Sequence, residues 1–171
     1  IAFRIPDIVT VNEVFPTDMP LEDVPTYLAS LKARAYSPLL TPRDILITAD
    51  TVVICDGILL GKPTDASHAA EMLRFLSGKQ HMVVTGVSLA TKSFSHSFAV
   101  STLVTFRVLN DDEISHYVEK YHPLDKAGAY GIQEWIGFIG IERIEGSYFN
   151  VMGLPVQRLY IELLNFVDTI K

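Results

Sequence analysis

At 171 residues the chain is long enough for one globular domain that buries about 70% of its unfolded surface. Hydrophobic residues make up 49% and charged residues 20% of the sequence, which excludes a disordered or fibrous chain. The formal net charge is -6 and Lys and Arg form no cluster, so polymeric DNA or RNA is not an expected partner. A small anionic ligand remains compatible with this charge, because a few focused cations suffice to hold phosphates.

Cys55 is the only cysteine, so an internal disulfide and a cysteine-paired metal site are excluded, and a reducing compartment is favoured. No apolar run approaches the roughly 18 residues that a bilayer span requires. The first ten residues lack the basic start and cleavage site of a signal peptide. We therefore expect a cytoplasmic protein that does not use a membrane.

The first third of the chain predicts a strand, a helix and a β-hairpin. Val24, Leu28 and Leu31 recur at helical spacing, and Asp56-Gly57 is a strong two-residue hairpin signal. The expected elements are a strand Ala2–Val11, a helix Leu21–Tyr36, and strands Ile45–Ile54 and Ile58–Leu60.

The middle of the chain predicts a helix between Lys62-Pro63 and Gly78, capped by Thr64 or Asp65. Two long strands follow, and then a short helix in which Asn110 and Glu113 stand at capping-box spacing. The expected bounds of these three elements are His81–Ala90, Phe98–Leu109 and Asn110–Tyr121.

The last third predicts a glycine-containing loop Pro123–Gly131, an apolar strand Trp135–Ile144 and a final helix that Pro155 starts. Strands and helices alternate, but the hairpin interrupts a purely parallel pattern. The expected fold class is therefore α/β, with an elongated, mixed and twisted sheet and flanking helices in a single domain 1–171.

Asp50 raises the main functional question, because Val, Ile, Leu and Ala surround it on a strand that reads as buried. Burying an unpaired carboxylate costs several kcal/mol, so Asp50 is paired, metal-bound or functional. A structural ion pair, with Lys62 as a candidate partner, is the alternative that the residues leave open.

Other polar side chains could join Asp50. Carboxylates that hold a divalent cation or a water, together with lysines that neutralise phosphate oxygens, are what phosphoryl-group hydrolysis requires. Glu13, Lys32 and Lys62 are of this kind, although Lys32 also fits a lysine at the margin of a half-buried helix. The five histidines show no close metal-ligand pair, and we interpret them as surface or capping residues.

Five stretches carry a resemblance in the same order along nearly the whole chain: "ADTVV", "LGKP", "MLRFLSGKQHMVVTGV", "DKAGAYGIQ" and "GSYFNVMGLP". The sequence closely resembles the Maf family of nucleoside triphosphate pyrophosphatases, once described as septum-formation inhibitors. The resemblance implies an elongated α/β fold related to the inosine triphosphate pyrophosphatases, with a cleft between two lobes. It also implies hydrolysis of a nucleoside triphosphate to the monophosphate and pyrophosphate with a divalent cation, Mg2+ or Mn2+, and a homodimer is an expected partner state.

By this resemblance Asp50 matches the catalytic acid that activates water and is the candidate metal ligand. Lys62 and Lys32 match lysines near the phosphates, and Glu13 matches an acidic residue before the first helix. Thr51 and Gln133 match positions linked to base selection. The loop "DKAGAYGIQ" is similar to that of the subgroup acting on dTTP and UTP.

The chain departs from the family pattern in two places. It lacks an N-terminal strand and S-x-S-P-R-R segment, which we expect upstream of Ile1 and on which activity would depend. Glu134-Trp135 follows Gln133 where relatives often have glycine, so Glu134 is expected to narrow the base pocket or add negative charge. Two alternatives remain: a non-catalytic nucleotide-binding regulator of cell division, and a pyrophosphatase for 7-methyl-GTP or another modified nucleotide.

Overall fold

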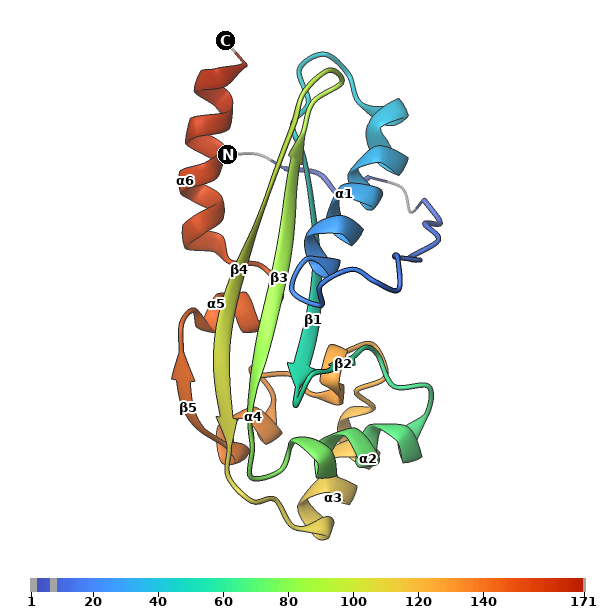
Figure 1. Ribbon diagram of the computed structural model, residues 1–171, viewed down its shortest axis with the longest axis vertical. Coiled ribbons are helices and arrows are strands. Elements are labelled where there is room, and N and C mark those ends of the chain that lie inside the picture. Colours follow the sequence, from blue (N-terminus) through green and yellow to red (C-terminus); the bar gives the residue numbers. More distant parts are fainter. Residues whose placement is uncertain (1–2, 7–8, 171) are drawn as a thin grey trace.

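The computed structural model describes residues 3–6 and 9–170, and within them five strands form one twisted sheet flanked by helices (Figure 1). The spatial order of the strands is β2-β1-β3-β4-β5. Their bounds are β1 Leu46–Cys55, β2 Ile58–Leu60, β3 Gln80–Ala90, β4 Ser95–Phe106 and β5 Ile141–Glu145. The predicted α/β class is confirmed.

All four neighbouring strand pairs are antiparallel, so the expectation of a mixed sheet is wrong. The cause lies in the connection through the second helix. That helix joins β2 to β3, which run in the same direction but are separated by β1. The alternation of strand and helix in the sequence therefore produces no parallel neighbours.

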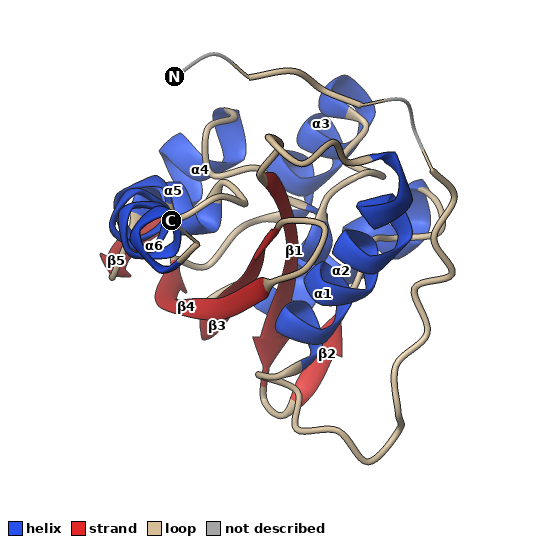
Figure 2. Ribbon diagram, turned by 90° about the horizontal axis from the view of Figure 1, so that it is seen from above, coloured by secondary structure: helices blue, strands red, loops and turns tan. Residues whose placement is uncertain are grey.

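The helices divide between the two faces of the sheet (Figures 1 and 2). One face is covered by α1, and α6 lies on the opposite face beside the upper half of the long strands. The helices α2, α3 and α4 gather around the lower half (Figure 1). The bounds are α1 Val24–Tyr36, η1 Ser37–Leu39, α2 Ala66–Leu76, α3 Asp111–Tyr121, η2 Ala127–Ala129, α4 Trp135–Gly140, α5 Tyr148–Val151 and α6 Val156–Thr169.

The alternation of side chains along β1 assigns its residues to two separate cores. Val52 and Ile54 pack with Val24 and Leu28 of α1. Val53 and Cys55 belong to the larger core that α2, α3 and α4 build on the other face. Even-numbered positions of β1 therefore face α1 and odd-numbered positions face away from it, as the period of two requires.

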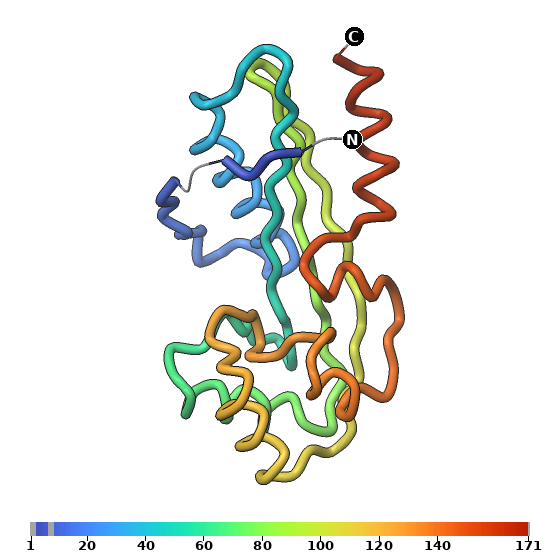
Figure 3. Tube along the Cα trace, turned by 180° about the vertical axis from the view of Figure 1, so that it is seen from behind, coloured from blue at the N-terminus to red at the C-terminus, as the bar shows by residue number. Residues whose placement is uncertain are grey.

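The segment before α1, which is dark blue in Figure 3, has no strand structure where it is described. Residues 3–6 and 9–11 of the expected strand Ala2–Val11 are irregular, and residues 2, 7 and 8 lie outside the described residues. Phe3 and Ile5 are almost fully exposed, so this apolar stretch lacks the packing that would favour a strand. The helix expected from Leu21 begins at Val24, after a turn.

The expected strand Trp135–Ile144 is instead the helix α4 followed by β5. Its apolar run does not distinguish a buried helix from a strand. Gly137 allows the helical turn to pack closely, because a Cβ there would lie 2.1 Å from the carbonyl oxygen of Ile132.

The predicted turns and caps are confirmed. Asp56 and Gly57 both adopt positive φ in the β1–β2 hairpin, as a type I′ turn requires. Asp65 caps α2, Asn110 and Glu113 form the capping box of α3, and α6 follows Pro155. Within the described residues, no helix combines the length and apolarity needed to span a bilayer.

Candidate active site

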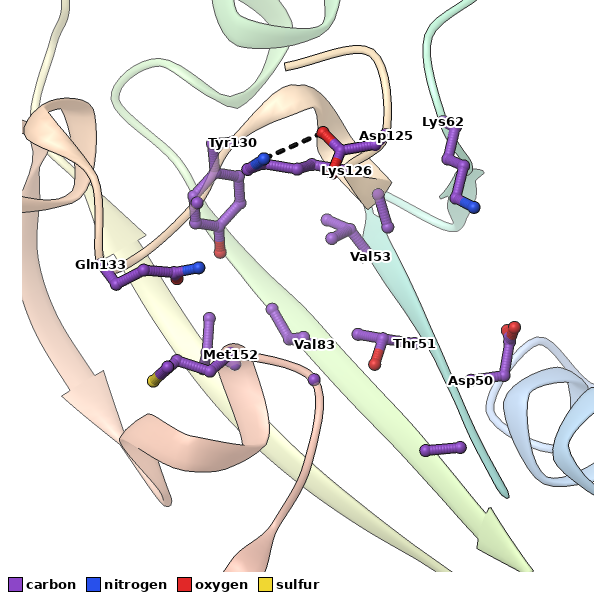
Figure 4. Close-up of a pocket in the computed structure, with 15 residues that line it drawn as sticks. Asp50, Thr51, Val53, Lys62, Val83, Asp125, Lys126, Tyr130, Gln133 and Met152 are labelled. Atoms are coloured by element: carbon purple, nitrogen blue, oxygen red, sulfur yellow. Dashed lines mark hydrogen bonds and ion pairs between the residues drawn. The ribbon is translucent and has the colours of Figure 1, made fainter. Parts of the chain in front are cut away.

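A pocket of about 320 Å³ opens beside the edge of β1 (Figure 4). Asp50 and Thr51 lie on this strand, ahead of the segment Val53–Cys55 that pairs with β2. Within the described residues, no strand covers this part of the β1 edge, so the pocket reaches side chains from both faces of the sheet. Lys62 and Gln133 also line it. The structure thus brings four of the six predicted site residues to one pocket.

The other two predicted residues meet Asp50 on the α1 side. The ammonium Nζ of Lys32 lies 2.5 Å from Asp50 Oδ1 and 3.1 Å from Glu13 Oε1. Helix α1 presents Lys32 toward β1, and the irregular segment before it brings Glu13 to the same ammonium. Asp50 is therefore in an ion pair, but its close partner is Lys32 rather than Lys62.

Burial and charge act on Asp50 in opposite directions. The side chain of Asp50 is only 12% exposed, and this desolvation raises its pKa, while the hydrogen bond and charge of Lys32 oppose the rise. Lys62 also favours the ionised carboxylate, and Glu13 disfavours it. The net effect raises the pKa above that of an ordinary aspartate, so Asp50 accepts a proton more readily than an exposed carboxylate does.

Lys32 stays protonated in this setting. Desolvation works against its charge, but the hydrogen bonds from its ammonium to Asp50 and Glu13 outweigh burial and raise its pKa. Lys62, in contrast, is exposed at the mouth of the pocket, and no ion pair engages it within the described residues. Figure 4 shows its ammonium pointing away from Asp125 and toward the end of the pocket where Asp50 lies.

Thr51 lies on the opposite face of β1 from Asp50 and belongs to a chain of hydroxyl groups. Its Oγ1 is 2.9 Å from Oγ1 of Thr85, which in turn donates to the carbonyl of Asn150 at 3.0 Å. Because Thr85 has a single proton, Thr51 must be the donor in their bond. The lone pairs of Thr51 are thus left to accept a hydrogen bond in the pocket.

Gln133 comes from the loop that precedes α4 and is exposed, with its amide directed into the pocket (Figure 4). The same loop contributes Lys126 and Tyr130 to the wall. This loop lies beside the loop between β2 and α2 that carries Lys62 (Figure 3). The N–H of Gly128 donates to the carbonyl of Gly61 at 3.0 Å. This bond joins the two loops on which Lys62 and Gln133 stand.

Glu134 lies behind the pocket wall and does not narrow the pocket. Its carboxylate accepts a short hydrogen bond from the hydroxyl of Tyr117, and its side chain packs against Gly131. The same carboxylate lies 3.2 Å from Nζ of Lys126. The negative charge that we expected Glu134 to add is therefore paired with the ammonium of Lys126 in the pocket wall.

His81 was interpreted as a surface or capping residue, and this is wrong. It is 2% exposed, and its Nε2 lies 2.8 Å from the hydroxyl of Tyr130 in the pocket wall. Burial lowers the pKa of His81 to about 4, so the ring is neutral at pH 7. The position of His81 at the start of a predicted strand did not indicate its burial. The residue that covers it, Tyr130, is 49 positions away in the sequence.

Asn150 is a further residue that the sequence did not single out. It is fully buried, and its side-chain amide donates to the carbonyl of Val83 and to the hydroxyl of Thr102. These bonds fix α5 and the following Met152 and Gly153 against the sheet, where both residues line the pocket. The only sequence signal near Asn150 was the stretch "FNVMG", which lacks clear helical or strand periodicity and therefore did not indicate that this residue is buried.

The donor set fits a divalent cation only when a ligand supplies further oxygens. Within the described residues no group of three or more His, Cys, Asp or Glu converges on one point. Asp50 and Glu13 nevertheless share one ammonium, so two carboxylates lie close together. Mg2+ is often held by one or two carboxylates together with substrate phosphates and water, and this arrangement suits such binding.

Sequence comparison places the chain in a known family. Residues 4–166 match the family described as Maf-like protein, and the chain belongs to this family. It is 54% identical over 153 residues to a dTTP/UTP pyrophosphatase of Bacteroides fragilis, covering 90% of this chain and 79% of the relative. Proteins of the same name from Porphyromonas gingivalis and Phocaeicola vulgatus are 54% and 51% identical over 167 and 163 residues. Those two matches cover 96% and 95% of this chain and 82% and 84% of the relatives.

Proposed function

We propose that this protein hydrolyses dTTP, UTP and related pyrimidine nucleoside triphosphates to the monophosphate and pyrophosphate. The observation that carries the proposal is the convergence of Asp50, Lys62, Thr51 and Gln133 on one pocket, with Lys32 and Glu13 directly behind Asp50. The names of the relatives, all about half identical to this chain, support the substrate class.

In the proposed reaction Asp50 takes a proton from a water molecule that attacks the α-phosphorus. The bond between the α-phosphorus and its bridging oxygen to the β-phosphate breaks, and pyrophosphate leaves. The raised pKa of Asp50 suits the role of general base, and Lys32 keeps its carboxylate oriented. Lys62, free at the mouth of the pocket, neutralises phosphate oxygens as charge develops.

Asp50 and Glu13 would hold a divalent cation, Mg2+ or Mn2+, together with the phosphates of the substrate. When bound, such a cation offsets the negative charge of the triphosphate. Lys32 holds both carboxylates within reach of one point, which prepares them for this role.

The base and sugar are proposed to lie on the opposite side of the β1 edge. There Thr51 offers an acceptor, and the amide of Gln133 offers both a donor and an acceptor. Nucleoside triphosphates occur in the cytoplasm, which we propose as the location. A homodimer remains a proposal that sedimentation analysis of the purified protein tests.

The decisive experiment measures pyrophosphate release from a panel of nucleotides with Mg2+ or Mn2+, including 7-methyl-GTP. We expect turnover of dTTP and UTP and its loss, by about 10³-fold or more, in Asp50→Asn, which has nearly the same shape but a poor proton acceptor. Circular dichroism checks that the variant is folded.

The same panel separates the alternatives. A form extended upstream of Ile1 is assayed beside this chain, because a non-catalytic regulator would bind nucleotides saturably without product in both forms. Turnover confined to 7-methyl-GTP would replace the pyrimidine assignment. Near-normal turnover by Asp50→Asn would remove Asp50 from the mechanism.

A further inference from the structure

The ammonium of Lys126 is held in the pocket wall between two carboxylates. Nζ of Lys126 lies 2.9 Å from Asp125 Oδ1, in an ion pair that is drawn as a dashed line in Figure 4, and 3.2 Å from Glu134 Oε1. An ammonium has three N–H donors, so two such partners leave one donor free. Within the described residues no third partner engages it, and the side chain lines the pocket. One N–H of Lys126 is therefore available to a bound molecule.

The position of this ammonium is fixed from behind the wall. Glu134 accepts the short bond from the hydroxyl of Tyr117, and that hydroxyl also accepts from the N–H of Gly131 at 3.1 Å. Tyr117 is fully buried and stacks on Tyr121. A buried tyrosine thus anchors both the carboxylate that holds Lys126 and the backbone just before Gln133.

Charge indicates which part of a nucleotide Lys126 contacts. Lys126, Asp125 and Glu134 together carry a formal charge of -1, so the group does not attract a triphosphate. Lys62 and Lys32 lie toward the Asp50 end, where the phosphates are proposed to bind. A charged N–H donor inside an overall anionic cluster suits a neutral acceptor instead, such as a carbonyl oxygen of a base.

On the basis of the proposed function, we propose that Lys126 is a specificity-determining residue that donates a hydrogen bond to the 4-carbonyl oxygen of uracil or thymine. Glu134 is the positioning residue that aims it. Cytosine carries an amino group at this position. Its N–H donors would face the N–H donor of Lys126, and no hydrogen bond could form between them. A site built to donate to an oxygen discriminates strongly against a ligand that lacks it, because the donor that the bound ligand covers is then left unpaired.

The test compares kcat/KM for UTP, CTP and the triphosphate of the pyrimidin-2-one riboside, which lacks the 4-substituent. The wild-type protein is expected to prefer UTP over both by about 10- to 100-fold, the range for one hydrogen bond to a charged group. In Lys126→Met this preference falls to within about threefold, mainly through a higher KM for UTP. Lys92→Met, at an exposed lysine in the β3–β4 turn, retains the wild-type preference.

Glu134→Gln keeps an acceptor for Tyr117 but removes the charge that aims Lys126, so it is expected to lose part of the preference while kcat for UTP is retained. A wild-type protein that hydrolyses UTP and CTP equally, or a Lys126→Met variant with unchanged preference, overturns the inference. If Lys126→Met fails to fold, Glu134→Gln decides in its place, because an unchanged preference for UTP in that variant would overturn the inference. Absence of any UTP hydrolysis by the wild type would instead contradict the proposed function.

Discussion

Asp50 illustrates how one neighbouring residue determines the state of a buried carboxylate. Desolvation raises the pKa of Asp50, and the hydrogen bond and charge of the adjacent Lys32 ammonium oppose this rise. The residual rise in pKa is useful for a general base, whereas a fully compensated aspartate would be a weaker one. Replacement of Lys32 would therefore change both the orientation and the basicity of Asp50.

His81 provides a prediction about stability and pH. Its pKa is about 4 in the folded protein and 6.5 in an unfolded chain. At a pH between these two values, His81 binds a proton in the unfolded state but not in the folded state. The free energy of unfolding therefore falls as the pH decreases from 6.5 to 4, by about 3 kcal/mol in total from this residue. In His81→Gln the decrease between pH 7 and pH 4, measured by urea unfolding, should be smaller by about that amount.

His122→Asn is the matched control for this measurement. His122 is exposed and adopts a left-handed conformation at the end of α3, which Asn tolerates well. The control should show the wild-type dependence on pH. If His81→Gln and the wild type lose the same stability between pH 7 and pH 4, His81 is not held neutral in the folded state.

Residue-level prediction from the sequence succeeded where a short-range pattern carries the information. The apolar neighbours of Asp50 marked it as a residue that needs compensation, and the structure supplies Lys32. The pairing of Lys32 with Glu13 was not predictable, because Glu13 lies in a segment without periodicity. His81 was missed for a related reason, since its burial depends on Tyr130, which is distant in the chain.

Helix α1 carries Lys32, and its close approach to β3 depends on one glycine. A Cβ on Gly86 would lie 2.2 Å from the backbone nitrogen of Thr26 and 2.3 Å from the carbonyl carbon of Pro25. These are backbone atoms near the start of the helix, so a larger residue must displace α1 as a unit. Gly86 is paired with Asp50 across the two strands, at the level of the ion pair.

Gly86→Ala is therefore expected to destabilise the protein by about 3 kcal/mol and to reduce pyrophosphate release, because α1 and Lys32 move away from Asp50. Gly61→Ala is the matched control, since a Cβ there meets no atom within 4 Å and its φ is not positive. The control should change the free energy of unfolding by less than about 1 kcal/mol. Equal stability of the two variants in thermal unfolding would contradict the proposed packing role.

At the level of elements, the sequence predicted most helices and strands but not all of their types. Caps and turns were predictable because Asp65, Asn110 and Gly57 act on adjacent backbone. The helix α4 was not, because a short apolar run does not distinguish a buried helix from a strand, and the close contact of Gly137 with Ile132 is seen only in the structure. The antiparallel sheet likewise depends on where β3 inserts, which no local pattern encodes.

The whole molecule binds its proposed substrate by drawing on parts that are distant in the chain. The pocket takes residues from β1, from the loop after β2, from the segment before α4 and from the end of α5. A ligand that contacts all of them stabilises the folded state, by about 2.7 kcal/mol at 100 times its dissociation constant. In Asp50→Asn, where turnover is blocked, UTP with Mg2+ should raise the melting temperature by roughly 5–10 °C.

UMP is the matched control ligand for this measurement. It lacks the β- and γ-phosphates that Lys62 is proposed to contact, so its stabilisation at the same concentration should be much smaller. Equal shifts with UMP and UTP would show that the Lys62 side of the pocket makes no net contribution to binding.

The exposed edge of β1 has a consequence for how such an enzyme changes over time. Asp50 and Thr51 are consecutive in the chain, but their side chains leave the ribbon in opposite directions, one toward α1 and the other toward Asn150. The carboxylate proposed for hydrolysis and the hydroxyl proposed to contact the base therefore lie on opposite faces of the same strand. We expect substitutions on the Thr51 face to change the nucleotide preference with little effect on the ion pair of Asp50 and Lys32, so that new preferences can arise without loss of hydrolysis.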